Sequence, residues 1–370
     1  MRKSIAIIIT SILVLSGCNK QQSVSDRLLN EVEKAIAINP DSASNLLKGI
    51  SSPEKLDNKT FARWCMLSGK ITDEIFNSIL PTYQLERAYD WYSSHGSPDE
   101  QVQILIYLGR SYFADGDYDK AMSIYTNALD IAEKNKLNNL TGYTYSYIGD
   151  LYGEKFMRTE AIKRYKAAAE CFKKENNTDS YACALRDVGR EYACIDSLSR
   201  ALKILTIADS VARNTKNIEV TASIDNALGN IYAMQNKYDK AEEYFLKALV
   251  GRETMPDYMA LIDLYIASGA INKAQELLSK ILQDNPKYTY SIKYLYYQIY
   301  NEEKNYKEAL TNLKEYVEIT DSIIYADNQS KILNIESKYN HLKISKEVDR
   351  LKIKQQSYII VLVICIGILL

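Results

Sequence analysis

The chain has 370 residues, with 46 basic and 47 acidic side chains, so its net charge at pH 7 is −1. This balance excludes the strongly basic surface that general nucleic-acid binders need, and contents of 46% apolar and 25% charged residues exclude a disordered chain. Glycine (14) and proline (6) are scarce, which favours helices with few sharp turns. The chain has 30 tyrosines but only two histidines, His95 and His341, so little is available for metal binding or acid–base catalysis.

The first residues are typical of an export signal. Arg2 and Lys3 form a charged start, and residues 5–14 form an apolar stretch that is too short to span a bilayer. Leu15-Ser16-Gly17-Cys18 follows and resembles the lipobox of bacterial lipoproteins, which implies cleavage before Cys18 and lipidation of its thiol. The alternative is a plain signal peptide with a chance cysteine. We expect a lipoprotein signal peptide over residues 1–17 and a polar tether over 18–25.

Residues 26–100 show helix pairs of irregular length. Asn39-Pro40-Asp41-Ser42 is typical of a break followed by a helix N-cap. Pro81 separates two longer apolar-periodic stretches, which we expect to form an antiparallel pair. The expected helices cover residues 28–37, a short segment that closes at 46–50, residues 61–80 and residues 82–93.

A 40-residue period runs through the middle of the chain. In four units an apolar residue precedes a glycine, a tyrosine follows three residues later, and two alanines follow that tyrosine. The glycines are Gly109, Gly149, Gly189 and Gly229; the tyrosines are Tyr112, Tyr152, Tyr192 and Tyr232; the alanines are Ala121, Ala128, Ala161, Ala168, Ala201, Ala208, Ala241 and Ala248. Two further units lack the glycine but keep tyrosine and alanine nine residues apart, at Tyr265 and Ala274 and at Tyr300 and Ala309.

This pattern resembles the tetratricopeptide repeat, a helix–turn–helix unit of about 34 residues. The resemblance covers residues 102–323 as six units and implies an all-α superhelical solenoid of antiparallel helix pairs. Small residues let the paired helices approach closely, and tyrosine fills the gap between them, so we expect most tyrosines to be structural. The additional residues of each unit are expected to lengthen a helix or a connecting turn.

The cysteines give no sign of a metal site. The spacings of Cys171, Cys183 and Cys194 match no zinc pattern. Cys171 and Cys183 flank an expected helix–helix turn, and the sequence leaves open whether they form a disulfide. We expect no metal and no cofactor.

The last repeat helix is expected to continue into a long juxtamembrane helix or coil over residues 324–357. A heptad-like stripe supports it, with polar Asn328 inside the stripe. The stripe consists of Tyr325, Ile332, Ile335, Tyr339 and Leu342. A two-stranded coil and packing back onto the last repeat are both open.

Residues 358–370 carry no charge. As a helix they rise about 20 Å, whereas a bilayer core is about 30 Å thick. We expect an incomplete transmembrane helix; a short membrane-dipping tail and a helix buried against another subunit are the alternatives.

The N-terminal helix pairs and the coil resemble those of a group of Gram-negative periplasmic tetratricopeptide proteins. Members of this group often continue beyond the membrane helix into a cytoplasmic coil and a helix-turn-helix output domain, which this sequence does not contain. The resemblance implies a membrane-bound sensor or scaffold with its array in the periplasm, at the inner membrane rather than the outer membrane.

Ligand contacts are expected on the concave face of the solenoid, which the first helix of each pair lines in this family. The inward positions are Ile106, Arg110, Ser146, Asp150, Arg186, Arg190, Asn226, Asn230, Met259, Asp263, Tyr294 and Gln298, with Tyr143 and Tyr147 nearby. From these, the candidate ligand-binding residues are Arg110, Tyr147, Asp150, Arg186, Arg190, Asn226 and Asn230.

The two guanidinium groups of Arg186 and Arg190 and the amides of Asn226 and Asn230 form a set similar to the carboxylate-clamping surface of peptide-binding members of the family. The alternative is that Asp150 and Asp263 pair with the arginines and leave no free donors.

We expect no enzymatic activity, because the sequence has neither a Gly-rich phosphate loop nor a nucleophile elbow. The interpretation is a membrane-anchored scaffold or sensor that binds a protein or peptide through its concave face and binds no nucleic acid. The alternative is an outer-membrane assembly or structural lipoprotein without a signalling role. The partner and the oligomeric state stay open.

Overall fold

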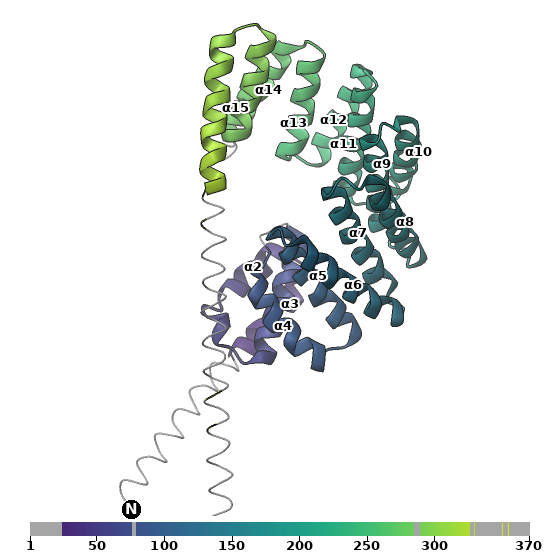
Figure 1. The fold of residues 1–370 in the computed structure, drawn as a ribbon, viewed down its shortest axis with the longest axis vertical. Helices are drawn as coiled ribbons and strands as arrows, with labels where there is room; N and C mark the ends of the chain where they lie inside the picture. Colours follow the sequence, from purple (N-terminus) through teal and green to yellow (C-terminus); the bar gives the residue numbers. More distant parts are fainter. Residues whose placement is uncertain are drawn as a thin grey trace, which may run out of the picture.

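A computed structural model describes residues 24–75, 79–284 and 289–325, together with the single residues 329, 350 and 354. Within this part of the chain every regular element is a helix. Successive helices follow one another along an open arc from α2 to α15 (Figure 1). The prediction of an all-α solenoid is thereby confirmed for the described residues.

The N-terminal region has helices of unequal length. It contains a helix over residues 24–36, α2 (Pro40–Lys48), the short 3-10 helix η1 (Pro53–Lys55), α3 (Asn58–Ile75) and α4 (Thr82–His95). The predicted N-cap is present, because the Asn39 side chain accepts a hydrogen bond of 2.9 Å from the Ser42 amide. Pro40 occupies the start of α2, where its missing N–H leaves no hydrogen bond unmade.

The middle of the chain is regular. Its helices are α5 (Pro98–Ala114), α6 (Tyr118–Lys134), α7 (Asn138–Glu154), α8 (Arg158–Lys174), α9 (Thr178–Cys194), α10 (Leu198–Ala212), α11 (Ile218–Met234) and α12 (Tyr238–Gly251). Most of them have 17 residues and most connections have three, so two helices and two turns account for the 40-residue period. Since the turns are this short, the additional residues of each unit lie in the helices.

The three-residue turns share one backbone conformation. Their middle residue has positive φ, which is 78° at Gly116 and 56–58° at Lys136, Phe156, Asn176, Asp196 and Asn236. In each case the following amide bonds back into the helix; Asp117 N donates to the Tyr112 carbonyl at 2.9 Å. This is the Schellman arrangement, which satisfies carbonyls left free at a helix end.

Each regular unit packs a glycine of its first helix beneath a large side chain of its second helix. A Cβ atom on Gly109 would lie 2.3 Å from the Tyr125 ring, and one on Gly149 would lie 2.7 Å from the Tyr165 ring. The other two pairs are Gly189 with Leu205 and Gly229 with Phe245. The glycine therefore allows the close helix approach that the sequence predicts, and the side chain that fills the space comes from the second helix.

The helices shorten after the regular region. They are α13 (Met255–Ala267), α14 (Ile271–Asp284), α15 (Thr289–Glu302) and a last described helix over residues 306–325. In the first of these units Ile262 and Leu278 stand where the regular units have glycine and the large side chain, and both are buried. The unit thus keeps its packing with two aliphatic residues of similar size.

Several predictions concern residues outside the described part. They are the signal peptide over 1–17, lipidation of Cys18, most of the tether, the coil beyond residue 325 and the apolar segment 358–370. None of the described helices combines the length and the apolar composition needed to cross a membrane. Cys65, Cys171, Cys183 and Cys194 are free thiols, so the disulfide between Cys171 and Cys183 that the sequence left open is not formed.

Candidate ligand-binding groove

The first helices of the regular units line the inner side of the arc, and their partners α8 and α10 lie on its outer side (Figure 1). The N-terminal halves of α7, α9 and α11, with residues from the ends of α3 and α8, enclose a cavity of about 420 Å³, the concave cavity. It is lined by Asp73, Tyr143, Ser146, Tyr147, Phe172, Asp179, Ser180, Cys183, Ala184, Asp187, Asn217, Glu219 and Val220. Ile106, which was expected to face inward, is instead buried in the core because α5 is covered on several sides.

Arg110 and Tyr147, both predicted ligand-binding residues, contact each other. The Arg110 guanidinium lies 5.4 Å from the centre of the Tyr147 ring, which itself stacks on Tyr125 with ring centres 5.8 Å apart. Arg110 also forms an ion pair with Asp73, and the Tyr107 hydroxyl donates to the same carboxylate at 2.9 Å. Burial raises the pKa of Tyr147 to about 12, so its hydroxyl stays protonated at neutral pH. The Arg110 guanidinium is therefore engaged by Asp73 and Tyr147 of the same chain.

Tyr143 connects α7 with the next unit. Its ring meets Phe172 edge to face, with ring centres 4.9 Å apart, and its hydroxyl shares a 2.9 Å hydrogen bond with the Ser180 hydroxyl. The side chain is still partly open to solvent. It therefore offers aromatic surface and a polar tip to a ligand in the concave cavity.

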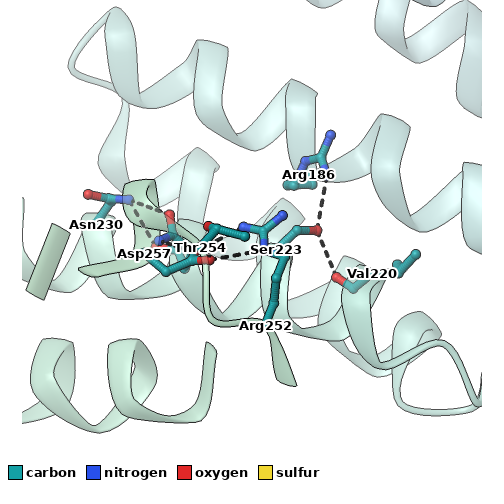
Figure 2. A network of polar contacts seen from close by, with 8 residues as sticks. Arg186, Val220, Ser223, Asn230, Arg252, Thr254 and Asp257 are labelled. Atoms are coloured by element: carbon teal, nitrogen blue, oxygen red, sulfur yellow. Dashed lines mark hydrogen bonds and ion pairs between the residues drawn. The ribbon is translucent and has the colours of Figure 1, made fainter. Parts of the chain in front are cut away.

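Arg186 is engaged within the chain. Its Nε donates to Oδ1 of Asp187 at 2.9 Å, and its Nη2 donates to Oδ2 at 3.0 Å. Its Nη1 donates to the Ser223 hydroxyl at 3.0 Å, and Ser223 donates to the Val220 carbonyl at 2.8 Å (Figure 2). Because the Arg186 guanidinium already binds the Asp187 carboxylate through two hydrogen bonds, it has few N–H donors left to bind the carboxylate of a ligand.

The two predicted amide residues also have partners inside the chain, and Figure 2 labels Asn230, Arg252 and Asp257 of this network. Asn226 donates to Oδ1 of Asp257 at 2.9 Å, and Asn230 donates to the carbonyl and to Oδ1 of Asn226 at 3.0 Å each. Asp257 is buried and also accepts from Arg252 at 2.9 and 3.0 Å. This network joins α11 to α13 at the place where the regular period ends.

Arg190 and Asp150 are both exposed, but neither belongs to the residues that line the concave cavity. Arg190 is exposed and makes no hydrogen bond or ion pair with any residue that the structure describes. Asp150 accepts a hydrogen bond of 2.6 Å from the Tyr165 hydroxyl and forms no ion pair with an arginine of the described chain. Desolvation by surrounding protein atoms raises the pKa of Asp150 to about 6, and nearby Asp187 adds to the rise, although the residue is partly exposed to solvent.

The acidic side of the concave cavity has an unused acceptor. Asn217 donates to Oδ2 of Asp179 at 2.9 Å, whereas Oδ1 of Asp179 is buried and has no hydrogen-bond partner among the described residues. Glu219 lines the same side and has no ion pair within the described chain. Buried acceptors are rarely left unsatisfied, so Asp179 is positioned to accept an N–H group from a ligand.

The sequence interpretation missed these acidic residues, although a signal for them exists. It considered two inward positions per unit, whereas the concave cavity also uses the first turns of α9 and α11. Asn139, Asp179 and Glu219 occupy the same position in three successive units and are all polar. Extending the periodicity to that turn would have identified them. No group of three or more His, Cys, Asp or Glu residues in the described chain is arranged to hold a metal ion.

Comparisons with known proteins agree with this fold. Residues 100–174 and 221–255 match family models described as tetratricopeptide repeat. None of the curated proteins matches the chain. The structure is similar to that of a Rap protein complexed with competence and sporulation factor, with 18% identity, a TM-score of 0.62, and coverage of 82% of this chain and 88% of that one.

Two further solved structures are similar. Apo RapI is 14% identical with a TM-score of 0.53, covering 86% of this chain and 96% of that one. A tetratricopeptide repeat protein from Parabacteroides merdae is 16% identical with a TM-score of 0.50, covering 70% of this chain and 93% of that one. Identities this low establish a shared fold and nothing finer. Over its described residues, the chain is an all-α solenoid that carries tetratricopeptide repeats.

Proposed function

We propose that this chain is a binding scaffold that holds a protein segment or peptide in the concave cavity. The observation that carries the proposal is the cavity itself, with its volume of about 420 Å³ and its lining of rings, hydroxyls and carboxylates. Clefts of this size that combine apolar surface with a few convergent polar groups are the usual form of ligand sites. The Rap protein of similar fold was crystallised with competence and sporulation factor, which supports a binding role for a solenoid of this kind.

The charges around the cavity favour a ligand with N–H donors and a basic group. The lining residues include four carboxylates and no basic side chain. Arg110 and Arg186 neutralise Asp73 and Asp187 from outside the lining, which leaves Asp179 and Glu219 to attract a ligand. This differs from the carboxylate clamp expected from the sequence, of which only Arg190 is without a partner among the described residues.

A second part of the proposal concerns location. We propose that the chain is lipid-anchored at Cys18, with the array in the periplasm at the inner membrane, as the sensor part of a transmembrane regulator. The lipobox-like residues support the anchor, and the resemblance to the Gram-negative periplasmic group supports the location and the sensor role. In cells supplied with labelled fatty acid, we expect the label on the chain and its loss in Cys18→Ser. Fractionation of the two membranes then distinguishes the proposals: recovery in the inner membrane is expected, and recovery in the outer membrane would support a structural lipoprotein instead.

The binding proposal is tested by filling the concave cavity. A random peptide library is selected on the purified full-length chain, and the affinity of an enriched peptide is then measured for two variants. Ser146→Trp places an indole in the cavity, whereas Thr126→Trp places one on an exposed site of α6. We expect at least a tenfold loss of affinity for the first and none for the second.

The charge preference has its own readout in the same selection. Enriched peptides should contain lysine or arginine, and Asp179→Asn should weaken them because it removes a carboxylate beside the ligand. Equal affinity of wild type and Ser146→Trp would rule out the concave cavity as the site. Selection of acidic peptides would instead support the arginine-based clamp.

A further inference from the structure

The last described helix, residues 306–325, has two apolar stripes, and one of them packs on the array. Ala309 and Asn312 are buried against the preceding helices. The Tyr316 ring lies 5.2 Å from the Tyr294 ring of α15, and Glu315 pairs with Lys293 at 2.5 Å. This inner stripe fixes the helix as the end of the described solenoid.

Most of the other stripe is exposed, although two of its positions are covered in an internal unit. Aligning the repeat alanines Ala309 and Ala161 places Leu310 at the position of Ile162 in α8. The same alignment places Val317 at the position of Ala169. Leu310 and Val317 are 67% and 46% exposed, whereas Ile162 and Ala169 are 6% and 2% exposed. Ile162 is covered because it packs against Val188 of α9, in the next unit. The outer stripe therefore has the form of a surface that a further helix covers.

The spacing of the outer stripe matches a helix pair. Its members alternate by four and three residues, which is the spacing that keeps a continuous seam along two helices wound around each other. They are Tyr306, Leu310, Leu313, Val317, Thr320 and Ile324. A seam of this kind can pack against an identical seam, so that each contact is made twice across a two-fold axis.

We propose that the outer stripe is covered by the outer stripe of a second copy of this chain, with the two helices antiparallel. The orientation follows from the charges along one edge of the stripe. At about 100° per residue, Lys307, Lys314, Glu318 and Asp321 share this edge, and all four are exposed. The basic pair lies in the first half of the helix and the acidic pair in the second half.

An antiparallel pair places the basic half of each helix beside the acidic half of the other, because the same edges then face each other. In a parallel pair this charged edge does not face the same edge of the other helix, so the basic and acidic halves are not brought together. Within the helix Lys314 lies 3.9 Å from Glu318, which is a loose contact between exposed groups. Lys307 and Asp321 form no ion pair in the described chain, so both are available to a second copy. This pairing is independent of the ligand proposed for the concave cavity.

Cysteine cross-linking of the full-length chain in mild detergent distinguishes the arrangements. The variants are Tyr306→Cys and Ile324→Cys, at opposite ends of the stripe, with Ser322→Cys as an exposed control on another side of the helix. In an antiparallel pair, mixing the first two variants gives a disulfide-linked dimer, and neither variant cross-links alone. The unmodified chain is run beside them, because Cys194 is also exposed.

A dimer formed by each variant alone would overturn the antiparallel arrangement, and no specific dimer in any sample would overturn the pairing itself. A second measurement avoids cysteine chemistry. Leu310→Ser with Val317→Ser should leave the helical circular dichroism unchanged, since both side chains are exposed in the single chain, while the mass measured by light scattering falls from two chains to one. An unchanged mass would contradict the proposal.

Discussion

The regular region, residues 98–251, and the following region, residues 252–325, contain the same tyrosine and alanine signature but pack differently. In the regular region Gly229 lies beneath Phe245, and the helices mostly have 17 residues. In the next unit Ile262 faces Leu278, and the helices have 13 and 14 residues. The turn conformation persists, with positive φ at Gly269 and Lys304.

Comparing the two regions separates the parts of the signature that all units share from the part that is specific to the regular region. Tyrosine, alanine and the left-handed turn are present in both regions. A first-helix glycine beneath a large second-helix side chain occurs in the four units of the regular region, whereas the next described unit has Ile262 at the glycine position. In the regular units the second helix supplies the side chain that fills the space, whereas in the next unit both helices supply one, and both kinds of pair are buried.

Alkaline pH should have the largest effect, and it acts mainly on the regular region. Burial raises the pKa of Tyr107, Tyr125 and Tyr165 above the usual tyrosine range. Because the folded chain keeps these protons after the unfolded chain loses them, stability is complete below about pH 10 and falls as the pH rises further. At pH 11 the loss is about 1.4 kcal/mol per buried phenol, or about 4 kcal/mol for the three.

The measurement is urea unfolding at pH 8 and pH 11, with hydrogen exchange to locate the opening in residues 98–174. Tyr125→Phe is the matched control, since Tyr125 makes no hydrogen bond with any described residue, and it should reduce the loss by about a third. Equal losses for wild type and Tyr125→Phe would contradict burial of this phenol as the cause.

Converting one packing type into the other should have an intermediate effect. A Cβ atom on Gly229 would lie 2.6 Å from the Phe245 ring, so Gly229→Ile should destabilise the chain by about 1–3 kcal/mol. Adding Phe245→Leu recreates the pair of Ile262 and Leu278 and should recover at least half of that loss. A double-mutant cycle from urea unfolding measures the coupling; effects that add within about 0.5 kcal/mol would show that the two positions do not share their volume.

The smallest expected effect concerns the shared turn. Phe156 is exposed and holds φ at 58°, a conformation that costs L-residues about 1–2 kcal/mol. Phe156→Gly should therefore stabilise the chain by about 0.5–1 kcal/mol, less any loss of the Arg158 contact with the ring at 5.0 Å. Gly116→Ala, at the equivalent turn, should destabilise it by a similar amount. Thermal unfolding of both variants gives the comparison, and a change of the same sign in both would refute it.

The fold could be predicted well from the sequence because the helix pairs depend on local periodicity. The N-cap at Asn39, the regular period and the close approach at the glycines were all evident without coordinates. The partner of each glycine was missed, because it lies on the opposite helix of the pair and only tertiary packing brings the two together. The left-handed turns at Phe156 and Lys136 were also missed, since neither residue type favours positive φ.

The site was predicted less well than the fold. Helical periodicity placed Tyr147 and Arg186 on the concave side, but it did not show that Arg186 is bidentate to its neighbour Asp187. Residues adjacent in sequence point in different directions on an ideal helix, so this pairing depends on rotamers that periodicity does not specify. The same limit applies to Arg110, whose partner Asp73 comes from α3.

The equal lengths of the two helices and the two turns in the regular region have a consequence for how such a chain changes during evolution. Removing or duplicating one whole period leaves every inward helix inward. Removing half a period deletes one helix with its turn. The turns, such as those at Lys136 and Phe156, then keep their regular spacing. Every helix after the deletion, however, changes from the inner side to the outer side or the reverse. The side chains of the concave cavity would then be carried to the outside. Natural relatives of different length should therefore differ by whole helix pairs.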